Sequence, residues 1–240
     1  MNEREMIVRV ADITFGIRCR YDALPLICED YAAEGQTPDF WLSASDEEIV
    51  REKQRAEDTI GEGLAESAAI LKKLGERLLA YNAFLLHAAV IEYEGVGYAF
   101  SAKSGVGKTT HIRRWRELFG DKVRVINGDK PIVRFIDGRV YAYGSPWCGK
   151  ERYGINDRCE LQSVCFLERD TENSIVRLEN RDALSRLIPQ IMLYRRGNDN
   201  LAVFTLIDRF FECEEFYLLR CDPTVNAAQV AYQAMKKEET

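Results

Sequence analysis

Histidine is scarce in this sequence, with two copies among 240 residues, and none of the seven cysteines belongs to a Cys-x-x-Cys pair. Zinc sites and disulfide frameworks use such residues at short, regular spacings, so the composition argues against both and favours reduced thiols. Long apolar runs are also missing, since no stretch approaches the ~20 residues that a membrane span requires. Residues 1–5 lack the basic-then-apolar pattern of a signal peptide. We therefore expect a cytoplasmic protein without membrane contact.

An excess of basic charge is absent as well. Lysine and arginine total 33 against 39 aspartates and glutamates, a formal net charge of −6, which disfavours a nucleic acid as the main partner. The one strong basic run, at residues 113–116, is interpreted as a solvated helix face. The length and the hydrophobic content of 46% suit one domain, or one domain with an additional lobe.

One Gly-rich run matches the core of a phosphate-binding motif, and it comprises Ser101, Ala102, Lys103, Ser104, Gly105, Val106, Gly107, Lys108, Thr109 and Thr110. A strand-like stretch (96–100) precedes it and a helix-like stretch (109–119) follows. Backbone N–H groups of a Gly-bearing turn, together with the positive end of the next helix, form an anion site. Residues 103–110 are therefore predicted to bind a nucleoside triphosphate. Lys108, as an exposed loop lysine, is expected to reach the β- and γ-phosphates, and the Thr109 hydroxyl to ligate Mg²⁺. Ala102 replaces the first glycine of the full motif.

The first third of the chain, residues 1–82, carries no catalytic pattern and is interpreted as a small accessory lobe. Two β-like runs (6–10 and 13–19) open it. A helical stripe then continues to about residue 81, although Gly75 weakens it.

Residues 83–240 are interpreted as the core. Apolar runs and turn residues predict strands over 87–93, 96–100, 123–127, 161–167 and 216–221, and a hairpin of 131–135 with 139–143. Helices are predicted over 109–119, 181–193, 201–210 and from about 223, with Asn180 as a cap and a break near Pro189. Hairpins around the Gly-rich run are unlike the parallel βαβ unit of the common P-loop enzymes. The expected fold class is thus a mixed α/β (α+β) nucleotide-binding fold of another kind.

The block of residues 86–130 resembles the C-terminal catalytic domain of HPr kinase/phosphorylase and, more distantly, ATP-dependent phosphoenolpyruvate carboxykinase. The matching features are Leu86-His87, Gly95-Val96-Gly97, the run from Ser104 to Thr109, and Gly128-Asp129. The resemblance extends over residues 84–170 and implies an HPr-kinase-like core. In the family an acidic pair usually follows the strand that corresponds to residues 123–127. In this sequence Asp129 is followed by Lys130, so only one carboxylate remains.

The resemblance implies ATP- and Mg²⁺-dependent phosphoryl transfer in which Lys108 binds phosphate, and Thr109 and Asp129 bind Mg²⁺. Asp129 would also be the general base, and His87 matches a histidine near the family's active site. From the residues alone, Asp129 is also consistent with a turn residue before Pro131, and His87 with a satisfied histidine at a strand end.

Several neighbouring residues allow either a role in the site or a purely structural role. Glu151 and Arg152 are consistent with charges near the phosphates or with solvated loop residues. Cys148 is consistent with a packed thiol, the favoured interpretation, or with an exposed reactive one. His111, in the first turn of the predicted helix, is expected at the surface.

Three functions remain open at this point. The first is a kinase whose acceptor is a hydroxyl, expected to be a serine of a small protein or peptide. The second is a kinase for a small metabolite, and the third is a nucleotide-binding regulatory module without chemistry, which the departures at Ala102 and Lys130 motivate. Members of the resembling family form rings, which implies a possible homo-oligomer.

Overall fold

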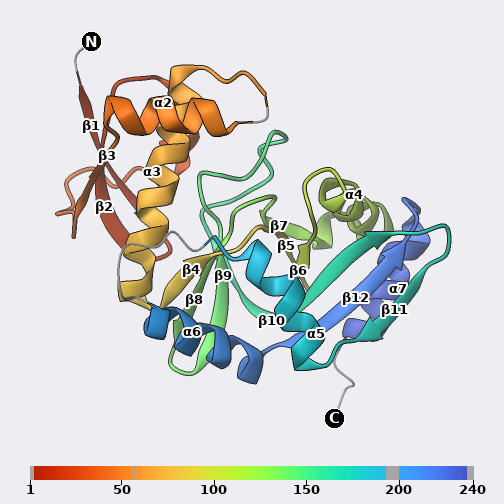
Figure 1. Ribbon diagram of the computed structural model, residues 1–240. Coiled ribbons are helices and arrows are strands. Elements are labelled where there is room, and N and C mark those ends of the chain that lie inside the picture. Colours follow the sequence, from red (N-terminus) through yellow and green to blue (C-terminus); the bar gives the residue numbers. More distant parts are fainter. Residues whose placement is uncertain (1–2, 57, 193–199, 237–240) are drawn as a thin grey trace.

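The computed structural model describes residues 3–56, 58–192 and 200–236 (Figure 1). Over this part of the chain the fold is mixed α+β, as expected, with a three-stranded sheet, a nine-stranded sheet and helices packed on both. The helix α3 (Glu62–Leu78) lies between the small sheet and the large one (Figure 1).

The N-terminal lobe contains the small sheet and three helices. Strands β1 (Arg4–Val10) and β2 (Ile13–Cys19) pair antiparallel, and β3 (Trp41–Ser43) joins β2 in parallel. The helices are α1 (Ala23–Cys28), α2 (Asp46–Arg55) and α3 (Glu62–Leu78).

The helical stripe expected to reach residue 81 is confirmed as α3 and the 3₁₀ turn after it (Leu79–Tyr81), and α2 precedes it as a separate helix. α2 begins at a capping box, in which the Ser45 hydroxyl accepts from the Glu48 backbone and the Glu48 carboxylate accepts from the Ser45 backbone. α2 ends at Arg55, and α3 begins after Gly61, which occupies its N-cap with extended dihedral angles. Gly75 is buried inside α3, which continues through it without a break.

The large sheet has the order β4-β8-β9-β10-β6-β5-β7, and β12 pairs with β10 and β11. Its strands are β4 (Ala83–Leu85), β5 (Ala88–Tyr93), β6 (Val96–Ser101), β7 (Arg124–Asn127), β8 (Ile132–Ile136), β9 (Arg139–Tyr143), β10 (Arg158–Arg169), β11 (Ser174–Arg177) and β12 (Glu215–Cys221). The predicted hairpin at 131–143 is confirmed as β8 and β9. β10 is longer than expected, because its first residues pair with β9 and its later residues lie between β6 and β12.

The strand directions bring several chain ends to one edge of this sheet. β10 is parallel to both β6 and β12, and β5 is antiparallel to both β6 and β7. It follows that β6, β7, β10 and β12 all run in the same direction. Their carboxyl ends therefore meet the amino end of β5 at a common edge, which is where open sheets of this kind bind ligands.

Both faces of the central strands are covered. Along β5, Ala89 and Ile91 belong to a cluster with Trp115 of α4 (Lys108–Phe119), whereas Ala88 and Val90 belong to a cluster on the opposite face. α7 (Val225–Met235) packs beside α4, and α5 (Asn180–Leu187) and α6 (Asn200–Cys213) contribute to the second cluster. Burial on both faces explains why these strands are almost entirely apolar.

The C-terminal helices largely follow the predicted pattern. α5 is capped by Glu179 rather than Asn180, and it ends at Leu187 before a 3₁₀ turn (Ile188–Gln190) that contains Pro189. The end of the predicted helix, at residue 193, lies outside the described residues. The helix expected at 201–210 is confirmed as α6.

The lobe and the core share apolar packing. One buried cluster contains Leu74 and Leu78 of α3 together with Leu85 of β4 and Ile132 of β8, and thus includes residues from both sides of residue 82. The Tyr143 hydroxyl also donates to Asp12 of the lobe, with 2.8 Å between the oxygens. Within the described residues, no helix is long and apolar enough to cross a membrane.

Candidate functional site

The Gly-rich loop, residues 102–107, connects β6 to α4 at the edge where the carboxyl ends of β6, β7, β10 and β12 meet. Gly105 and Gly107 have φ angles of 77° and 133°, values that an L side chain rarely adopts. A turn hydrogen bond of 3.2 Å from the Val106 N–H to the Lys103 carbonyl closes the loop. Ala102 is buried and keeps a negative φ, so the missing first glycine leaves the turn unstrained. This backbone is compatible with the anion cradle predicted from the sequence.

The amino end of α4 is open to a ligand. Gly107 forms the N-cap without a side-chain hydrogen bond, and the described first turn of α4 holds no acidic residue. Free N–H groups and the helix dipole therefore favour an anion in front of this turn.

Two cavities flank the loop. One, of about 380 Å³, lies between the first turn of α4 and the carboxyl ends of β10 and β12, and is lined by Thr110, Arg114 and Asp222 among others. The other, of about 690 Å³, lies on the opposite side and extends toward α5. Gly105 and Val106 line both, so a ligand on the loop has room on either side.

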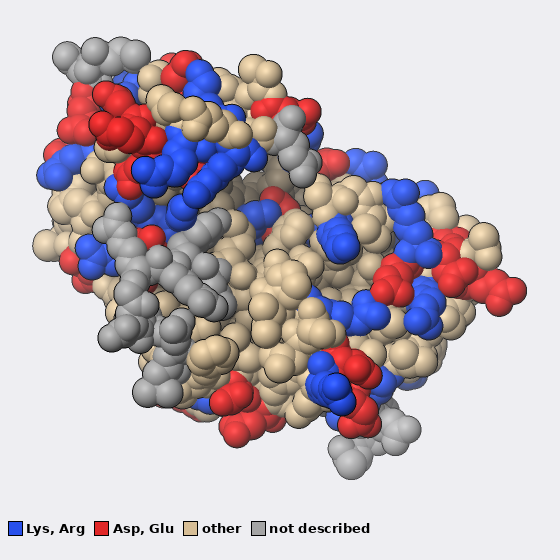
Figure 2. Space-filling model, viewed as in Figure 1, with Lys and Arg blue, Asp and Glu red and all other residues tan. Residues whose placement is uncertain are grey.

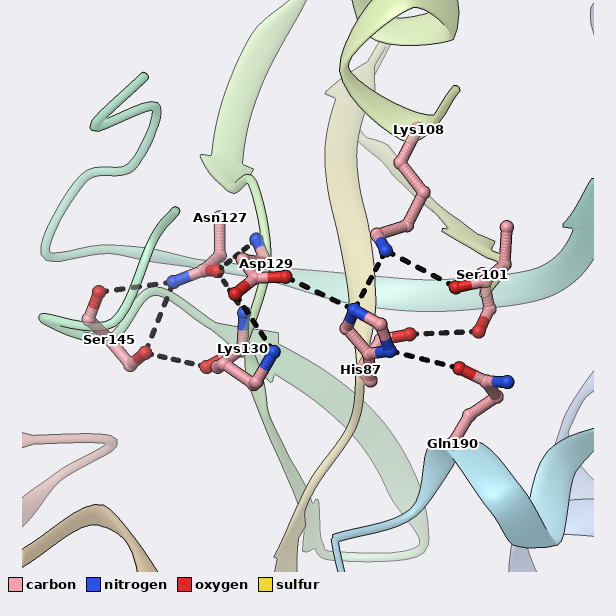
Figure 3. Close-up of polar contacts among 9 residues, drawn as sticks. His87, Ser101, Lys108, Asn127, Asp129, Lys130, Ser145 and Gln190 are labelled. Carbon is pink, nitrogen blue, oxygen red and sulfur yellow. Dashed lines mark hydrogen bonds and ion pairs between the residues drawn. The ribbon is translucent and has the colours of Figure 1, made fainter. Parts of the chain in front are cut away.

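Lys108 is buried, which corrects the expectation of an exposed loop lysine. Its Nζ lies 2.8 Å from His87 Nε2 and donates to the Ala102 carbonyl at 3.3 Å (Figure 3). Burial lowers the pKa of Lys108, and the nearby Asp129 charge opposes that effect. The buried ammonium thus lacks a full counter-charge, which favours the arrival of an anion.

His87 stands at the amino end of β5, and its two ring nitrogens have different neighbours. Nδ1 lies 3.1 Å from the Gln190 side-chain oxygen, which only accepts, so Nδ1 carries the proton. Nε2 then presents its lone pair to Lys108 and lies 3.3 Å from Asp129 Oδ1 (Figure 3). A proton taken up at Nε2 would therefore have a carboxylate to stabilise it.

Asp129 follows β7, and both of its carboxylate oxygens have partners. Oδ1 faces His87, and Oδ2 accepts from Lys130 Nζ at 2.8 Å. Burial alone would raise the pKa of Asp129, but the neighbouring His87 and the charge of Lys130, whose ammonium donates to Oδ2, outweigh burial and lower the pKa to about 2. The carboxylate is consequently ionised at any physiological pH.

The turn that carries Asp129 is fixed by Asn127, which is fully buried. Its side-chain oxygen accepts the backbone N–H groups of Asp129 and Lys130 at 2.9 and 2.8 Å. Its amide nitrogen donates to the Ser145 carbonyl and hydroxyl, and that hydroxyl donates to the Lys130 carbonyl at 2.6 Å (Figure 3). Asp129 is a turn residue and at the same time part of the cluster with His87 and Lys108.

Arg169, which sequence reasoning missed, braces the Gly-rich loop from the carboxyl end of β10. Its Nε donates to the Val106 carbonyl at 3.0 Å, and its Nη2 donates to the Gly105 carbonyl. One guanidinium thereby holds two successive carbonyls of the loop. The position of Arg169, at the end of a buried strand, is the signal that could have identified it.

The remaining predicted residues have varied surroundings. Lys103 and Ser104 are exposed at the loop tip, and Thr109 and Thr110 are half-buried in the first turn of α4. The described residues contain no group of three or more His, Cys, Asp or Glu side chains that could hold a metal.

His111 is buried, and its expected place at the surface is wrong. It contacts the ring of Phe100, and its Nε2 accepts from the Trp115 indole N–H at 3.0 Å. Burial lowers the pKa of His111 to about 3, so the ring stays neutral. Its role is to pack α4 against β6.

Two charged residues of the loop after β9 have partners in the lobe and in α4. Arg152 donates to the Leu26 carbonyl of the lobe at 3.0 Å, and Glu151 lies 3.8 Å from Arg113. Cys148 is half-buried, and burial raises the pKa of its thiol, which agrees with a packed and unreactive cysteine.

The residues present fit a nucleotide and one divalent cation. The open helix end and Lys108 suit a triphosphate, and the ionised Asp129 and the Thr109 hydroxyl are oxygen donors of the kind Mg²⁺ prefers. Mg²⁺ usually takes only one or two carboxylates and completes its shell with phosphates and water.

No family model matches the chain, and no curated protein is similar to it in sequence. Among solved structures, the chain is similar to the HPr(Ser) kinase/phosphatase from Coxiella burnetii. The aligned region covers 62% of this chain and 91% of the Coxiella chain. The sequence identity is 10% and the TM-score is 0.35. Function must therefore be inferred from the geometry of the site itself.

Proposed function

We propose that this protein is an ATP- and Mg²⁺-dependent kinase with an HPr-kinase-like core, and that it transfers the γ-phosphoryl group to a serine hydroxyl of a small protein or peptide. The convergence of Lys108, His87 and Asp129 beside the Gly-rich loop carries this proposal. A loop that only bound nucleotide would have no need for an ionised carboxylate and a histidine next to its lysine.

Each group has a defined role in the proposed reaction. The loop N–H groups and Lys108 hold the triphosphate, and the acceptor hydroxyl lies against Asp129. The hydroxyl oxygen bonds to the γ-phosphorus as the bond to the β–γ bridging oxygen breaks, and ADP leaves with that electron pair. The hydroxyl proton passes to Asp129.

The lowered pKa of Asp129 limits its strength as a base. His87 Nε2 lies 3.3 Å away and can take that proton on once Lys108 turns to the phosphates. Since the transition state of phosphoryl transfer is loose, positioning and charge count for more than base strength.

Thr109 and Asp129 are the residues that would hold Mg²⁺. When bound, the ion would neutralise charge on the transferring phosphoryl group. Lys130 would have to release the Asp129 oxygen that it now contacts at 2.8 Å.

That contact also favours a second candidate function, a nucleotide-binding module without chemistry. If Lys130 stays on Asp129 when nucleotide is bound, the carboxylate is unable to serve a metal or a hydroxyl. Turnover of ATP distinguishes the two functions.

The test is Asp129→Asn, which removes the charge and the base with little change in shape. We expect at least a ~100-fold loss of ATP turnover, the lower end of the usual effect of general-base loss, with nucleotide binding largely kept. The assay is ATP hydrolysis or radiolabelled phosphate transfer at saturating Mg²⁺, with folding matched by circular dichroism.

Asp137→Asn is the matched control, because Asp137 lies in the β8–β9 turn with a φ of 48°, a conformation that Asn tolerates. It should turn over ATP like the wild type. If Asp129→Asn turned over ATP within a few-fold of this control, Asp129 would have a purely structural role and the proposed reaction would be wrong.

A further inference from the structure

A groove lies between the N-terminal lobe and the loop that follows β9, and Figure 2 shows the surface hollowed between lobe and core. Its volume is about 520 Å³. The walls are mainly apolar and include Leu26 and Ile27 of α1, Leu64 and Leu71 of α3, and Trp147 of the loop.

The lining of the groove includes Asp129, the carboxylate that contacts His87. The loop after β9 passes close to it, since a Cβ built on Gly149 would lie 3.3 Å from the Asp129 Cβ. An occupant of the groove would therefore reach the same carboxylate that faces the Gly-rich loop from the other side.

The mouth of the groove exposes apolar surface. Leu26 and Leu64 are 59% and 60% exposed, the highest values for large apolar side chains among the described residues. Their position on two different helices at one opening marks a binding surface.

The walls are held in place by direct contacts between lobe and loop. The Trp147 indole N–H donates to the Ser67 hydroxyl of α3 at 2.9 Å, and Arg152 donates to the Leu26 carbonyl of α1 at 3.0 Å. The groove is thus formed before any partner arrives, which lowers the entropy cost of binding.

The charge along the groove is positive. Lys130, Lys150 and Arg152 line it, and Asp129 is the only carboxylate among its described lining residues. Asp129 is already paired with Lys130, and no described carboxylate forms an ion pair with Lys150 or Arg152. This surface is complementary to an occupant that carries negative charge.

We propose that the groove binds an extended segment of an acceptor protein, in which large apolar side chains and an acidic residue lie close to the hydroxyl residue. The proposal rests on the proposed function and specifies its acceptor. A polypeptide fits better than a small metabolite, because metabolite pockets enclose their ligand with convergent polar groups. Here the outer walls offer open apolar surface over two helices.

The experiment uses two readouts on the full-length protein. Fluorescence anisotropy measures binding of short labelled peptides that carry leucines and an aspartate around a central alanine, so no transfer occurs. Radiolabelled transfer then measures phosphorylation of the same peptides with a central serine. A peptide with glutamines in place of the leucines and a free serine serve as acceptor controls.

Leu64→Asp should weaken binding of the leucine peptide by ~10-fold, the value of about one buried leucine contact. The substitution lies in the first turn of α3, where a carboxylate is tolerated. Val50→Asp is the matched control, because Val50 is 51% exposed on α2 and lies outside the groove. It should bind peptide like the wild type.

Lys150→Glu tests the charge. It should weaken binding of the aspartate peptide by several-fold and restore binding of a peptide with lysine at that position. Equal peptide affinity in wild type, Leu64→Asp and Lys150→Glu would overturn the groove proposal, as would equal phosphorylation of the leucine and glutamine peptides. If wild type and Asp129→Asn both fail to turn over ATP, the kinase function fails, while the anisotropy result still decides the groove.

Discussion

The ammonium of Lys108 lies 2.8 Å from the Nε2 atom of His87, so the lysine of the Gly-rich loop donates to a histidine rather than to a carboxylate. A neutral partner holds the ammonium in position and leaves its charge uncompensated. Triphosphate binding can then draw on the whole charge of Lys108, which a direct ion pair with Asp129 would have reduced.

Lys108→Met should reduce nucleotide affinity while leaving the fold intact. Methionine keeps the apolar stem that packs in the buried site but removes the charge-assisted hydrogen bond, which is worth ~1.5–3 kcal/mol or ~10- to 100-fold in affinity. Titration calorimetry with a non-hydrolysable ATP analogue measures the change. Lys103→Met, in the exposed tip of the same loop, is the control and should change affinity less. Equal nucleotide affinities in wild type and Lys108→Met would show that the Gly-rich loop is not the nucleotide-binding site.

Arg169→Ala should loosen the Gly-rich loop. The guanidinium donates to two adjacent carbonyls, and their loss should weaken nucleotide binding by ~5- to 30-fold. Arg169→Lys keeps the positive charge but lacks the two guanidinium N–H donors that bind both carbonyls. This variant should therefore recover little of the lost nucleotide affinity. Calorimetry gives the affinities, and hydrogen exchange at residues 105–107 reports the order of the loop. Full recovery with lysine would mean that Arg169 acts through charge alone.

Asn127→Ala should destabilise the protein. It removes the acceptor of two backbone N–H groups in a buried turn, at a cost of ~2–4 kcal/mol in the free energy of unfolding. Chemical denaturation measures it. Asn156→Ala is the control, because Asn156 is exposed and makes one hydrogen bond, to the Asp30 carbonyl. A similar small effect for both would show that water replaces Asn127.

His111 should make stability depend on pH. Its pKa is lowered to about 3 in the folded protein, against ~6.5 in the unfolded chain. Between these values the unfolded chain binds a proton that the folded protein does not, so the free energy of unfolding falls as the pH decreases from ~6.5 toward 3.

The measurement is urea denaturation at pH 7 and pH 5. The wild type should lose ~2 kcal/mol more than His111→Gln over this interval, because glutamine does not titrate. An identical loss in both proteins would mean that His111 is accessible to protons in the folded state.

Local patterns predicted most of the elements, because strands and helices here follow from neighbouring residues. The β8–β9 hairpin needed only the Asp137-Gly138 turn, and the Gly-rich loop needed only its own glycines. α2, which the capping box at Ser45 begins and which ends before the extended Gly61, was not recognised from the sequence as a separate helix.

The surroundings of the site residues were not predictable in the same way. Gln190 reaches His87 from 103 positions away, and Arg169 reaches Gly105 from 64 positions away. Such contacts depend on which strands become neighbours, and no local pattern encodes that. The burial of Lys108 and His111 has the same origin, since the surrounding strands and helices enclose both side chains.

His87, Lys108 and Asp129 all come from one continuous stretch of chain, in which β5, β6, α4 and β7 follow one another. The groove, by contrast, is built mainly from α1, α3 and the loop after β9, which lie outside that stretch. Mutations in these outer segments can change what the protein recognises without moving the three reactive side chains. Evolution could thus alter partner choice and phosphate chemistry separately, by exchanging one part of the sequence while selection preserves the other.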